Sequence, residues 1–215
     1  IQEIIATVPG WSEEDNGLVH ARGIDDGFLF VTDGIPLSDR VGTFFAGSMD
    51  TEMIQSIQVI TGHIPVEYGD ASGGIINVVP KSGIDLPVSG RLTFSAGNFR
   101  TGEVSYTLQG NVKQKFGFFV TQSLSGSYQR YLDPIDPRNF NNRGGAVQLN
   151  VRGDWHPTSI DSLAVNLSIN GSDFRVPNTF EQEFALQRQR QQLRDNSESV
   201  SWQHIWSSDT VTNLG

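Results

Sequence analysis

The stretch IQVITGHIPVEYGDASGGIINVVPKSG, residues 57–83, decides the fold of this chain. Its first five residues alternate with the two-residue period of a half-buried strand. Two glycine-containing corners follow, Glu67-Tyr68-Gly69 and Gly73-Gly74, where the backbone can turn sharply or approach a neighbour closely. The β-branched run 75–79 predicts a strand buried on both faces, which ends at Pro80 because proline has no N–H to donate. The stretch therefore predicts two strands and a tight corner that close a small domain.

Seven motifs, in this stretch and upstream of it, occur in the order found in one protein family. They are Val8-Pro9-Gly10, Arg22-Gly23, Asp33-Gly34-Ile35-Pro36-Leu37, Ile57-Gln58-Val59 with Gly62, Glu67-Tyr68-Gly69, Gly73-Gly74-Ile75-Ile76-Asn77-Val78 and Lys81-Ser82-Gly83. Together they resemble the plug domain of TonB-dependent outer-membrane receptors. Gln58 stands where that family usually has Glu, and Pro80 where it often has Thr.

The resemblance implies a fold and a division into domains. Residues 1–83 are expected to be an α+β plug domain with a truncated start, and residues 84–87 a linker. Residues 88–215 are expected to be the first six strands of an antiparallel transmembrane β-barrel and the start of a seventh. The outer loops look like those of the carboxypeptidase-regulatory-like members of the family. The chain begins without Met or a signal peptide and ends in a strand-like stretch, so we expect an internal fragment.

The residues themselves also favour a wall of strands after Pro87. Apolar residues alternate there with small hydroxyl and amide residues over several segments of ten or more residues, a length that crosses a bilayer at a tilt. A β-sandwich also alternates, but its strands are usually shorter. Aromatic residues lie near the expected strand ends, as in interfacial girdles. The apolar side consists of Leu92, Phe94, Val104, Tyr106, Leu108, Phe116, Phe118, Val120, Val147, Leu149, Val151, Leu163, Val165, Leu167, Ile169, Val200, Trp202, His204 and Trp206, and the end aromatics are Tyr128, Trp155, Trp202 and Trp206.

The predicted connections between these strands alternate in length. Segments 111–114, 156–160 and 207–209 are short, whereas 129–143 and 173–197 are long. Outer-membrane barrels have short turns on the periplasmic side and long loops outside. Within the second long segment we predict a helix over 180–193 and a solvated loop around its arginines.

Composition excludes several function classes. Hydrophobic residues make up 37% of the 215 residues, and no run of about 18 apolar residues is present. The net charge of −9 argues against nucleic acid as a partner. Cysteine is absent, so disulfides, thiol nucleophiles and cysteine-type zinc sites are excluded.

Upstream of the deciding stretch, local signals predict smaller elements. Residues 11–17 are predicted to be an acidic loop; its spacing matches no calcium loop. The turn Asp25-Asp26-Gly27 predicts a hairpin between strands at 18–23 and 28–32. A short helix is expected at 50–54, capped by Asp50 or Ser48.

The resemblance and the loops together give candidate site residues. By resemblance, Arg22 is the plug arginine that forms an ion lock with acids of the barrel wall; as an unrelated strand residue it would simply face solvent. Two interpretations of the Phe44-Phe45 pair remain open, a ligand floor or packing against the wall. The long loops offer possible outer ligand contacts or loop–loop packing through Tyr131, Phe140, Phe180 and Phe184.

Catalytic signatures are missing from the sequence. It has no nucleophile elbow, phosphate-binding glycine loop or H-E-x-x-H motif. The four-residue spacing of His63 and Glu67 suits metal ligands only on a helix, which Pro65 disfavours. We therefore expect a non-enzyme without cofactor or metal.

The resemblance implies uptake of a scarce nutrient across the outer membrane of a Gram-negative bacterium, with the plug gating the barrel. The implied partners are outer-membrane lipid, TonB through a segment missing here, and a small ligand such as a siderophore, oligosaccharide or peptide. Two alternatives stay open: a non-transporting signalling or adhesion receptor on the same scaffold, and a soluble secreted carbohydrate-binding β-protein.

Overall fold

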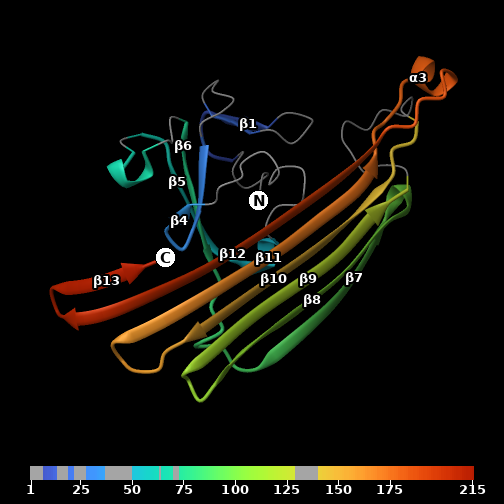
Figure 1. Ribbon diagram of the computed structural model, residues 1–215. Coiled ribbons are helices and arrows are strands. Elements are labelled where there is room, and N and C mark those ends of the chain that lie inside the picture. The colour runs from blue at the N-terminus through green and yellow to red at the C-terminus, as the bar shows by residue number, and fades with distance from the viewer. Residues whose placement is uncertain are drawn as a thin grey trace.

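The computed structural model describes residues 7–13, 19–21, 28–36, 50–62, 64–69, 73–128 and 140–215. Figure 1 shows small sheets from the first part of the chain beside a wall of long strands. Within the described residues, no helix combines the length and the apolar character that a membrane crossing requires.

A four-stranded sheet forms the centre of the first part. It contains β3 (Phe28–Thr32), β4 (Ile35–Pro36), β5 (Ile54–Ile60) and β6 (Gly74–Pro80) in the order β4-β3-β6-β5. β6 runs parallel to β3 and antiparallel to β5. Because β6 lies between two strands and is covered on both faces, most of its residues are buried. The predicted doubly buried strand is therefore confirmed.

Both faces of this sheet carry apolar side chains. Trp11, Phe30, Ile76 and Val78 form one buried cluster, and Leu29, Val31 and Ile75 form the other. The turn between β3 and β4 has positive φ at Asp33 (50°) and Gly34 (82°), as the primed turns of tight hairpins require. Asp50 accepts a hydrogen bond from the Glu52 N–H at 2.9 Å and caps the short 3₁₀ helix η1 (Thr51–Met53), so the predicted cap is confirmed. A second 3₁₀ helix, η2 (Val66–Tyr68), occupies the first corner of the deciding stretch.

Two predictions for the upstream residues are wrong. Strand β1 (Trp11–Glu13) lies where a loop was predicted, and it pairs antiparallel with β2 (Val19–Ala21). The predicted hairpin between 18–23 and 28–32 does not form, since β3 pairs with β4 and β6 instead. The Asp-Gly signal reflects only the local backbone preference for a turn. Because β3 is apolar on both faces, it buries more apolar surface between two strands of a sheet than in a two-stranded hairpin.

The wall is one antiparallel sheet of seven strands in chain order, as predicted. Its strands are β7 (Ser89–Gly97), β8 (Thr101–Val112), β9 (Phe116–Ser127), β10 (Gly144–Trp155), β11 (Asp161–Arg175), β12 (Arg190–Ser207) and β13 (Thr210–Leu214). Connections 113–115, 156–160 and 208–209 lie at one end. The 3₁₀ helix η3 (Asn98–Arg100), the end of β9, the start of β10 and the connection 176–189 lie at the other. We call these the short-turn end and the long-loop end.

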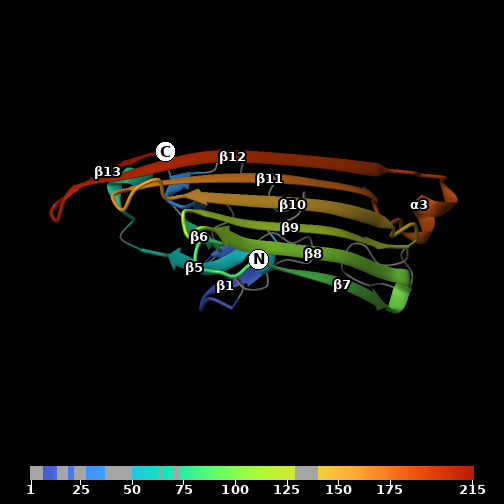
Figure 2. The ribbon, with the colours of Figure 1, turned by 90° about the horizontal axis from the view of Figure 1, so that it is seen from below.

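The wall has two chemically different faces. The outer face exposes large apolar residues, among them Phe94, Val104, Leu124, Val147, Val165 and Val200. The inner face carries small polar residues and meets the four-stranded sheet, which lies on one side of the wall in Figure 2. Exposed Tyr128, Trp155 and Trp206 lie near strand ends. The predicted alternation of the strands is confirmed.

The second long connection is shorter than predicted. Helix α3 spans only Phe180–Phe184, and Thr179 caps it in a capping box with Gln182. β12 begins at Arg190, so the predicted helix to 193 and the predicted arginine loop are both wrong. The outer part of β12 has no apolar alternation that could have revealed a strand.

Candidate functional site

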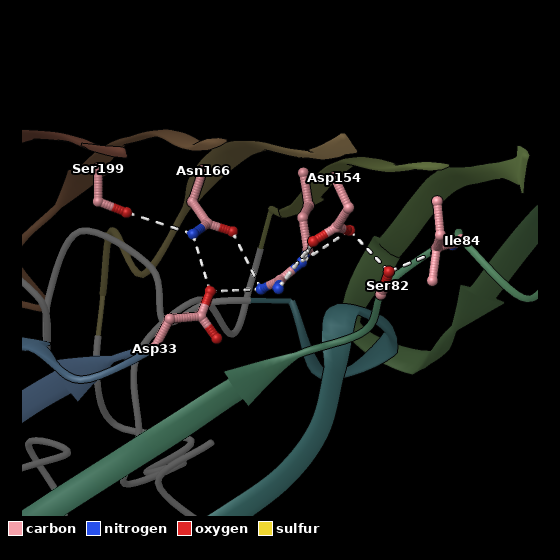
Figure 3. A network of polar contacts seen from close by, with 7 residues as sticks. Asp33, Ser82, Ile84, Asp154, Asn166 and Ser199 are labelled. Atoms are coloured by element: carbon pink, nitrogen blue, oxygen red, sulfur yellow. Dashed lines mark hydrogen bonds and ion pairs between the residues drawn. The ribbon is translucent and has the colours of Figure 1, made fainter. Parts of the chain in front are cut away.

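A buried arginine of the wall connects the wall to the four-stranded sheet. Arg152 lies on β10 at an inward-facing position, two residues from Asp154 on the same face. Asp33 approaches it from the tight turn after β3. The register places Arg152 directly opposite Asn166 of β11, and Asn166 opposite Ser199 of β12. Three wall strands and one turn therefore converge on one point (Figure 3).

The contacts at this point form a continuous polar network. The Arg152 guanidinium pairs with the Asp33 carboxylate and donates from Nε to both Asp154 oxygens at 3.1 Å. Asn166 Nδ2 donates to Asp33 Oδ2 at 3.0 Å and to Ser199 Oγ at 3.2 Å. We call Asp33, Arg152, Asp154, Asn166 and Ser199 the plug-facing network.

The charged members of this network are largely shielded from water. The side chains of Arg152 and Asp33 are 11% and 14% exposed, and that of Asp154 is 7% exposed. Two carboxylates share one guanidinium, so removal of the arginine would leave two buried negative charges together. Breaking a buried pair in this way is strongly destabilising, whereas a pair with all its partners is tolerated. The network is therefore a latch whose opening costs free energy.

The Lys81-Ser82-Gly83 motif fastens the chain after β6 to the same part of the wall. Ser82 Oγ donates to Asp154 Oδ2 at 2.7 Å and accepts from the Ile84 N–H at 3.2 Å. The Lys81 ammonium lies 5.8 Å from the centre of the Phe119 ring, a cation–π distance. Each side-chain-bearing residue of the motif thus contacts or supports the wall.

Glycines allow this segment to lie directly on the wall backbone. A Cβ at Gly83 would stand 2.0 Å from the Phe118 carbonyl oxygen, and one at Gly117 would stand 2.4 Å from the Ile84 nitrogen. No side chain fits at these two positions unless the backbone shifts. The third residue of the motif, Gly83, must therefore be glycine, because the wall backbone lies too close to it for a Cβ.

Two hollows border the plug-facing network. One of about 20 Å³ is lined by Thr32, Met53, Asn150 and Asn166 among others, and is large enough for one water molecule. The buried Asn150 Nδ2 has no hydrogen-bond partner among the described residues, so a water there would satisfy it. The other hollow, of about 810 Å³, is bordered by Asp33, Arg152, Asp154 and Tyr68 and opens beside the last wall strands.

The described motif residues lie on the four-stranded sheet or in the turns and corners beside its strands. Asp33 is in the network and Gly34 completes its turn, while Tyr68 packs on the second apolar cluster. Gly74 has φ of +151°, and a Cβ there would lie 3.0 Å from the Ile60 carbonyl oxygen. Gly69 and Gly73 flank the corner, and Asn77 lies on β6. For Glu67 the structure describes the backbone in η2 but not the side chain.

Other predicted site residues are not brought together with this network. Arg22, Gly23, Phe44, Phe45 and Tyr131 lie outside the described residues. The remaining loop aromatics sit at the long-loop end. There the Phe140 and Phe180 rings are 6.3 Å apart, and Phe140 is bridged to Asn178 by backbone hydrogen bonds of 2.8 Å. Phe184 is 83% exposed.

Sequence reasoning missed the wall side of the network. Arg152, Asp154, Asn166 and Ser199 all occupy the polar side of the predicted alternation, which was assigned only to a wet interior or a plug contact. A usable signal existed, because Arg152 and Asp154 are the only charged residues among the inward positions of β10. Charged residues on the covered face of a strand require partners of opposite sign.

The arrangement is suited to holding two parts together and not to bond chemistry. Among the residues that the structure describes, no group of three His, Cys, Asp or Glu side chains could hold a metal ion. The network contains fixed charges and amides, with no nucleophile beside a base. It forms an electrostatic contact between the turn after β3 and strands β10 and β11 of the wall.

Comparisons with known proteins agree with this two-part architecture. Residues 1–75 match the family model of the TonB-dependent Receptor Plug Domain. The TonB-dependent transporter Oar of Myxococcus xanthus is 31% identical over 84 residues, which cover 38% of this chain and 8% of Oar.

Solved structures share the fold of the whole chain at low sequence identity. FpvA of P. aeruginosa, in a complex with a pyoverdine and iron, aligns with 98% of this chain and 30% of its own, at 14% identity and a TM-score of 0.73. The ferric-catecholate import receptor Fiu of E. coli K12 aligns with 98% of this chain and 34% of its own, at 13% identity and a TM-score of 0.72. The chain thus spans about a third of the length of these structures and a much smaller part of Oar. These relatives are transporters and receptors rather than enzymes.

Proposed function

We propose, from the premise that this chain carries the plug domain of the TonB-dependent receptors and the fold of their first barrel strands, that the protein takes up a scarce ligand across an outer membrane. The observation that carries the proposal is the latch between Asp33 of the plug and Arg152 of the wall. A plug held by a buried ion pair closes the lumen at rest and requires work to move. That is the behaviour a gated transporter needs.

In this proposal residues 1–83 are the plug, 84–87 the linker and 88–215 the first wall strands. Plugged transporters of this kind close with about 22 strands, so seven strands are about a third of such a wall. The apolar outer face supports burial in lipid, because the isolated sheet would otherwise leave it in water. The protein would lie in the outer membrane of a Gram-negative bacterium, with the long-loop end outside.

Movement of the plug would begin with the loss of the Asp33–Arg152 pair. Arg152 keeps Asp154 as a partner when Asp33 leaves, so the guanidinium in the wall is still paired with a carboxylate. Asp33 would enter the adjoining hollow of about 810 Å³, where water can solvate it. The two-acid arrangement therefore lowers the cost of opening while keeping the closed state favoured. TonB is the proposed source of the work.

The ligand is proposed to bind at the long-loop end and the plug apex. Phe140, Phe180 and Phe184 are exposed there and supply apolar contact area, with Tyr131, Phe44 and Phe45 as further candidates from outside the described residues. Exposed aromatic rings suit siderophores, oligosaccharides and peptides alike. Arg22 is proposed as a second ion lock between plug and wall.

The test is energy-dependent uptake by the intact protein in its host. A gene deletion should abolish uptake of one labelled ligand class, among ferric siderophores, oligosaccharides and peptides, and a protonophore should do the same to the parent strain. A D33C/N166C protein treated with a short bis-maleimide should restore surface binding but not uptake. Each single-cysteine variant treated with the same reagent serves as the control, because this chain has no cysteine of its own.

Three outcomes would contradict the proposal. Surface binding without uptake in the parent strain would indicate a signalling or adhesion receptor. Wild-type uptake by the crosslinked protein would mean that the plug does not gate at this contact. Recovery of the protein in the soluble secreted fraction would indicate a carbohydrate-binding protein.

A further inference from the structure

The inner face of the wall has a hollow near the long-loop end of β7, β8 and β9, which lie side by side in Figure 1. Its volume is about 400 Å³, and small hydroxyl side chains make up most of its polar lining. We call it the β7–β9 hollow. The inward-facing residues that line it are Ser95, Gly97, Thr101, Glu103, Ser125 and Ser127.

Glu103 is the only charged residue among the described residues that line this hollow. It lies on β8 directly opposite Ser95 of β7 and Ser125 of β9. Ser125 alternates in step with Phe119, which is opposite the inward-facing Arg152, so these residues face the plug side of the wall. The Glu103 carboxylate has no hydrogen-bond or ion-pair partner within the described part of the chain. A carboxylate can only accept hydrogen bonds, so the hollow has an acceptor at its centre.

Thr101 presents a second acceptor to the hollow. Its hydroxyl donates to the Asn98 carbonyl oxygen at 2.9 Å, which uses its one hydrogen and leaves the oxygen lone pairs to accept. Thr101 lies opposite Gly97 of β7. A Cβ at Gly97 would stand 2.7 Å from Thr101 Oγ1, so the glycine leaves this oxygen uncovered. The φ of Gly97 is −143°, an extended conformation that any residue can adopt.

No cation of the described residues neutralises Glu103. Arg91, the inward-facing cation of β7, lies 3.7 Å from the Glu52 carboxylate of η1 and is directed to the plug. Arg100 borders a different hollow together with Tyr128. The Glu103 carboxylate is therefore available to a positive group that comes from outside the chain.

We propose that the β7–β9 hollow binds a primary ammonium group of the transported ligand, with Glu103 and Thr101 as acceptors. An ammonium has three N–H donors and one positive charge, which match an acceptor-rich lining with one carboxylate. An anionic ligand would instead meet Glu103 without a cation to offset the repulsion. A peptide with a free amino group and an amino sugar both present this chemistry. The inference rests on the proposed function, in which the ligand enters at the long-loop end, and it narrows the ligand classes given there.

The experiment measures the binding of small probes to the intact purified protein in detergent by saturation-transfer NMR titration. The probes are tetraalanine and tetraglucosamine, each compared with its N-acetylated form, which has no ammonium group. The variants are E103Q, which removes the charge and keeps the shape, and G97A, which covers the Thr101 oxygen without a change of charge. The control is E198Q, which makes the same charge change at an exposed position of β12 opposite Leu167 on the outer face.

At least one of the two amine probes should bind the wild type about tenfold more tightly than its acetylated form, since a charged hydrogen bond replaces a neutral one. E103Q should lose this preference, G97A should weaken it and E198Q should keep it. A preference for tetraalanine assigns the site to peptides, and one for tetraglucosamine assigns it to amino sugars. Equal binding of the amine and acetylated probes to the wild type overturns the inference. An equal loss in E103Q and E198Q also overturns it, because net charge would then be the cause.

Hydrogen exchange of β3 and β6 in E103Q separates a contact with ligand from a contact with the plug. Unchanged exchange is expected, whereas faster exchange would assign Glu103 to the plug and overturn the inference. Uptake assays separate the two proposals. Amine binding that depends on Glu103 in a protein without energy-dependent uptake refutes transport alone. Energy-dependent uptake of a ligand without an amino group, unchanged in E103Q, refutes only the ammonium site.

Discussion

Replacement of Arg152 by methionine should loosen the plug more than any other single change in the plug-facing network. Methionine keeps much of the side-chain length but leaves Asp33 and Asp154 as two buried carboxylates without a cation. Removal of one partner from a buried pair costs about 3–5 kcal/mol. At about 1.4 kcal/mol for each tenfold, the plug should open about 100- to 4,000-fold more often.

Asp33→Asn should cost much less. Arg152 keeps its bonds to Asp154, and the oxygen of the introduced amide can still accept from Arg152 and Asn166. The contact between Arg152 and residue 33 would change from a charged to a neutral hydrogen bond, which should cost on the order of 1.5 kcal/mol of stability. The triple variant R152M/D33N/D154N has no buried carboxylate left without a cation. It should therefore recover most of the stability that R152M loses.

Hydrogen exchange followed by mass spectrometry measures these differences in the intact protein in lipid vesicles. Amides of β3 and β6 report plug opening, and amides of β8 in the same sample are the internal reference. The reasoning is refuted if R152M changes plug exchange less than threefold. It is equally refuted if the triple variant exchanges as fast as R152M, because the stranded charges would then not be the cause.

Three further predictions follow from backbone approach and from the outer face. Gly74→Ala should destabilise the plug by about 1–3 kcal/mol, because its Cβ would lie 3.0 Å from a carbonyl oxygen and the residue has a positive φ. Gly62→Ala is the control and should be near neutral, since a Cβ there would have no atom within 4 Å. The same hydrogen-exchange experiment measures both variants. Gly117→Ala should lower the yield of folded protein in a heat-modifiability assay, because its Cβ would lie 2.4 Å from the Ile84 nitrogen of the linker. Gly153→Ala is the control and should fold normally, since the atom nearest to its Cβ would be 3.8 Å away. Val165→Arg should cost about 2–4 kcal/mol of folding free energy in lipid vesicles, and an equal stability of both proteins would argue against contact with lipid.

The two-residue period of the wall strands was readable from sequence because each face has one environment. Leu163, Val165, Leu167 and Ile169 could be assigned to one side without knowing any partner strand. The same rule failed at the outer part of β12, where the residues from Arg190 to Ser199 are polar at nearly all positions of both faces. A strand that is held only by backbone hydrogen bonds to its neighbour cannot be predicted from the alternation of polar and apolar side chains.

The plug-facing network was only half readable. Asp33-Gly34 identifies its own turn through local backbone preference, but the partner of Asp33 lies 119 positions along the chain. No spacing within the sequence encodes that meeting, which depends on how the plug docks. Likewise, the Asp25-Asp26-Gly27 signal predicted a local hairpin, and the parallel pairing of β3 with β6 prevailed because β3 is apolar on both faces.

The parallel pairing of β3 and β6 gives the plug a direction of mechanical strength. β6 leaves the sheet at Pro80 and is fastened to the wall two residues later through Ser82. A tension applied to the chain ahead of β3 would therefore act on opposite ends of two parallel strands. Such tension shears the ladder and loads all of its hydrogen bonds at once, whereas antiparallel strands pulled from one end would unzip bond by bond. Under load from the N-terminal side, the segments ahead of β3 should extend first, and the sheet from β3 to β6 should be the last part of the plug to yield.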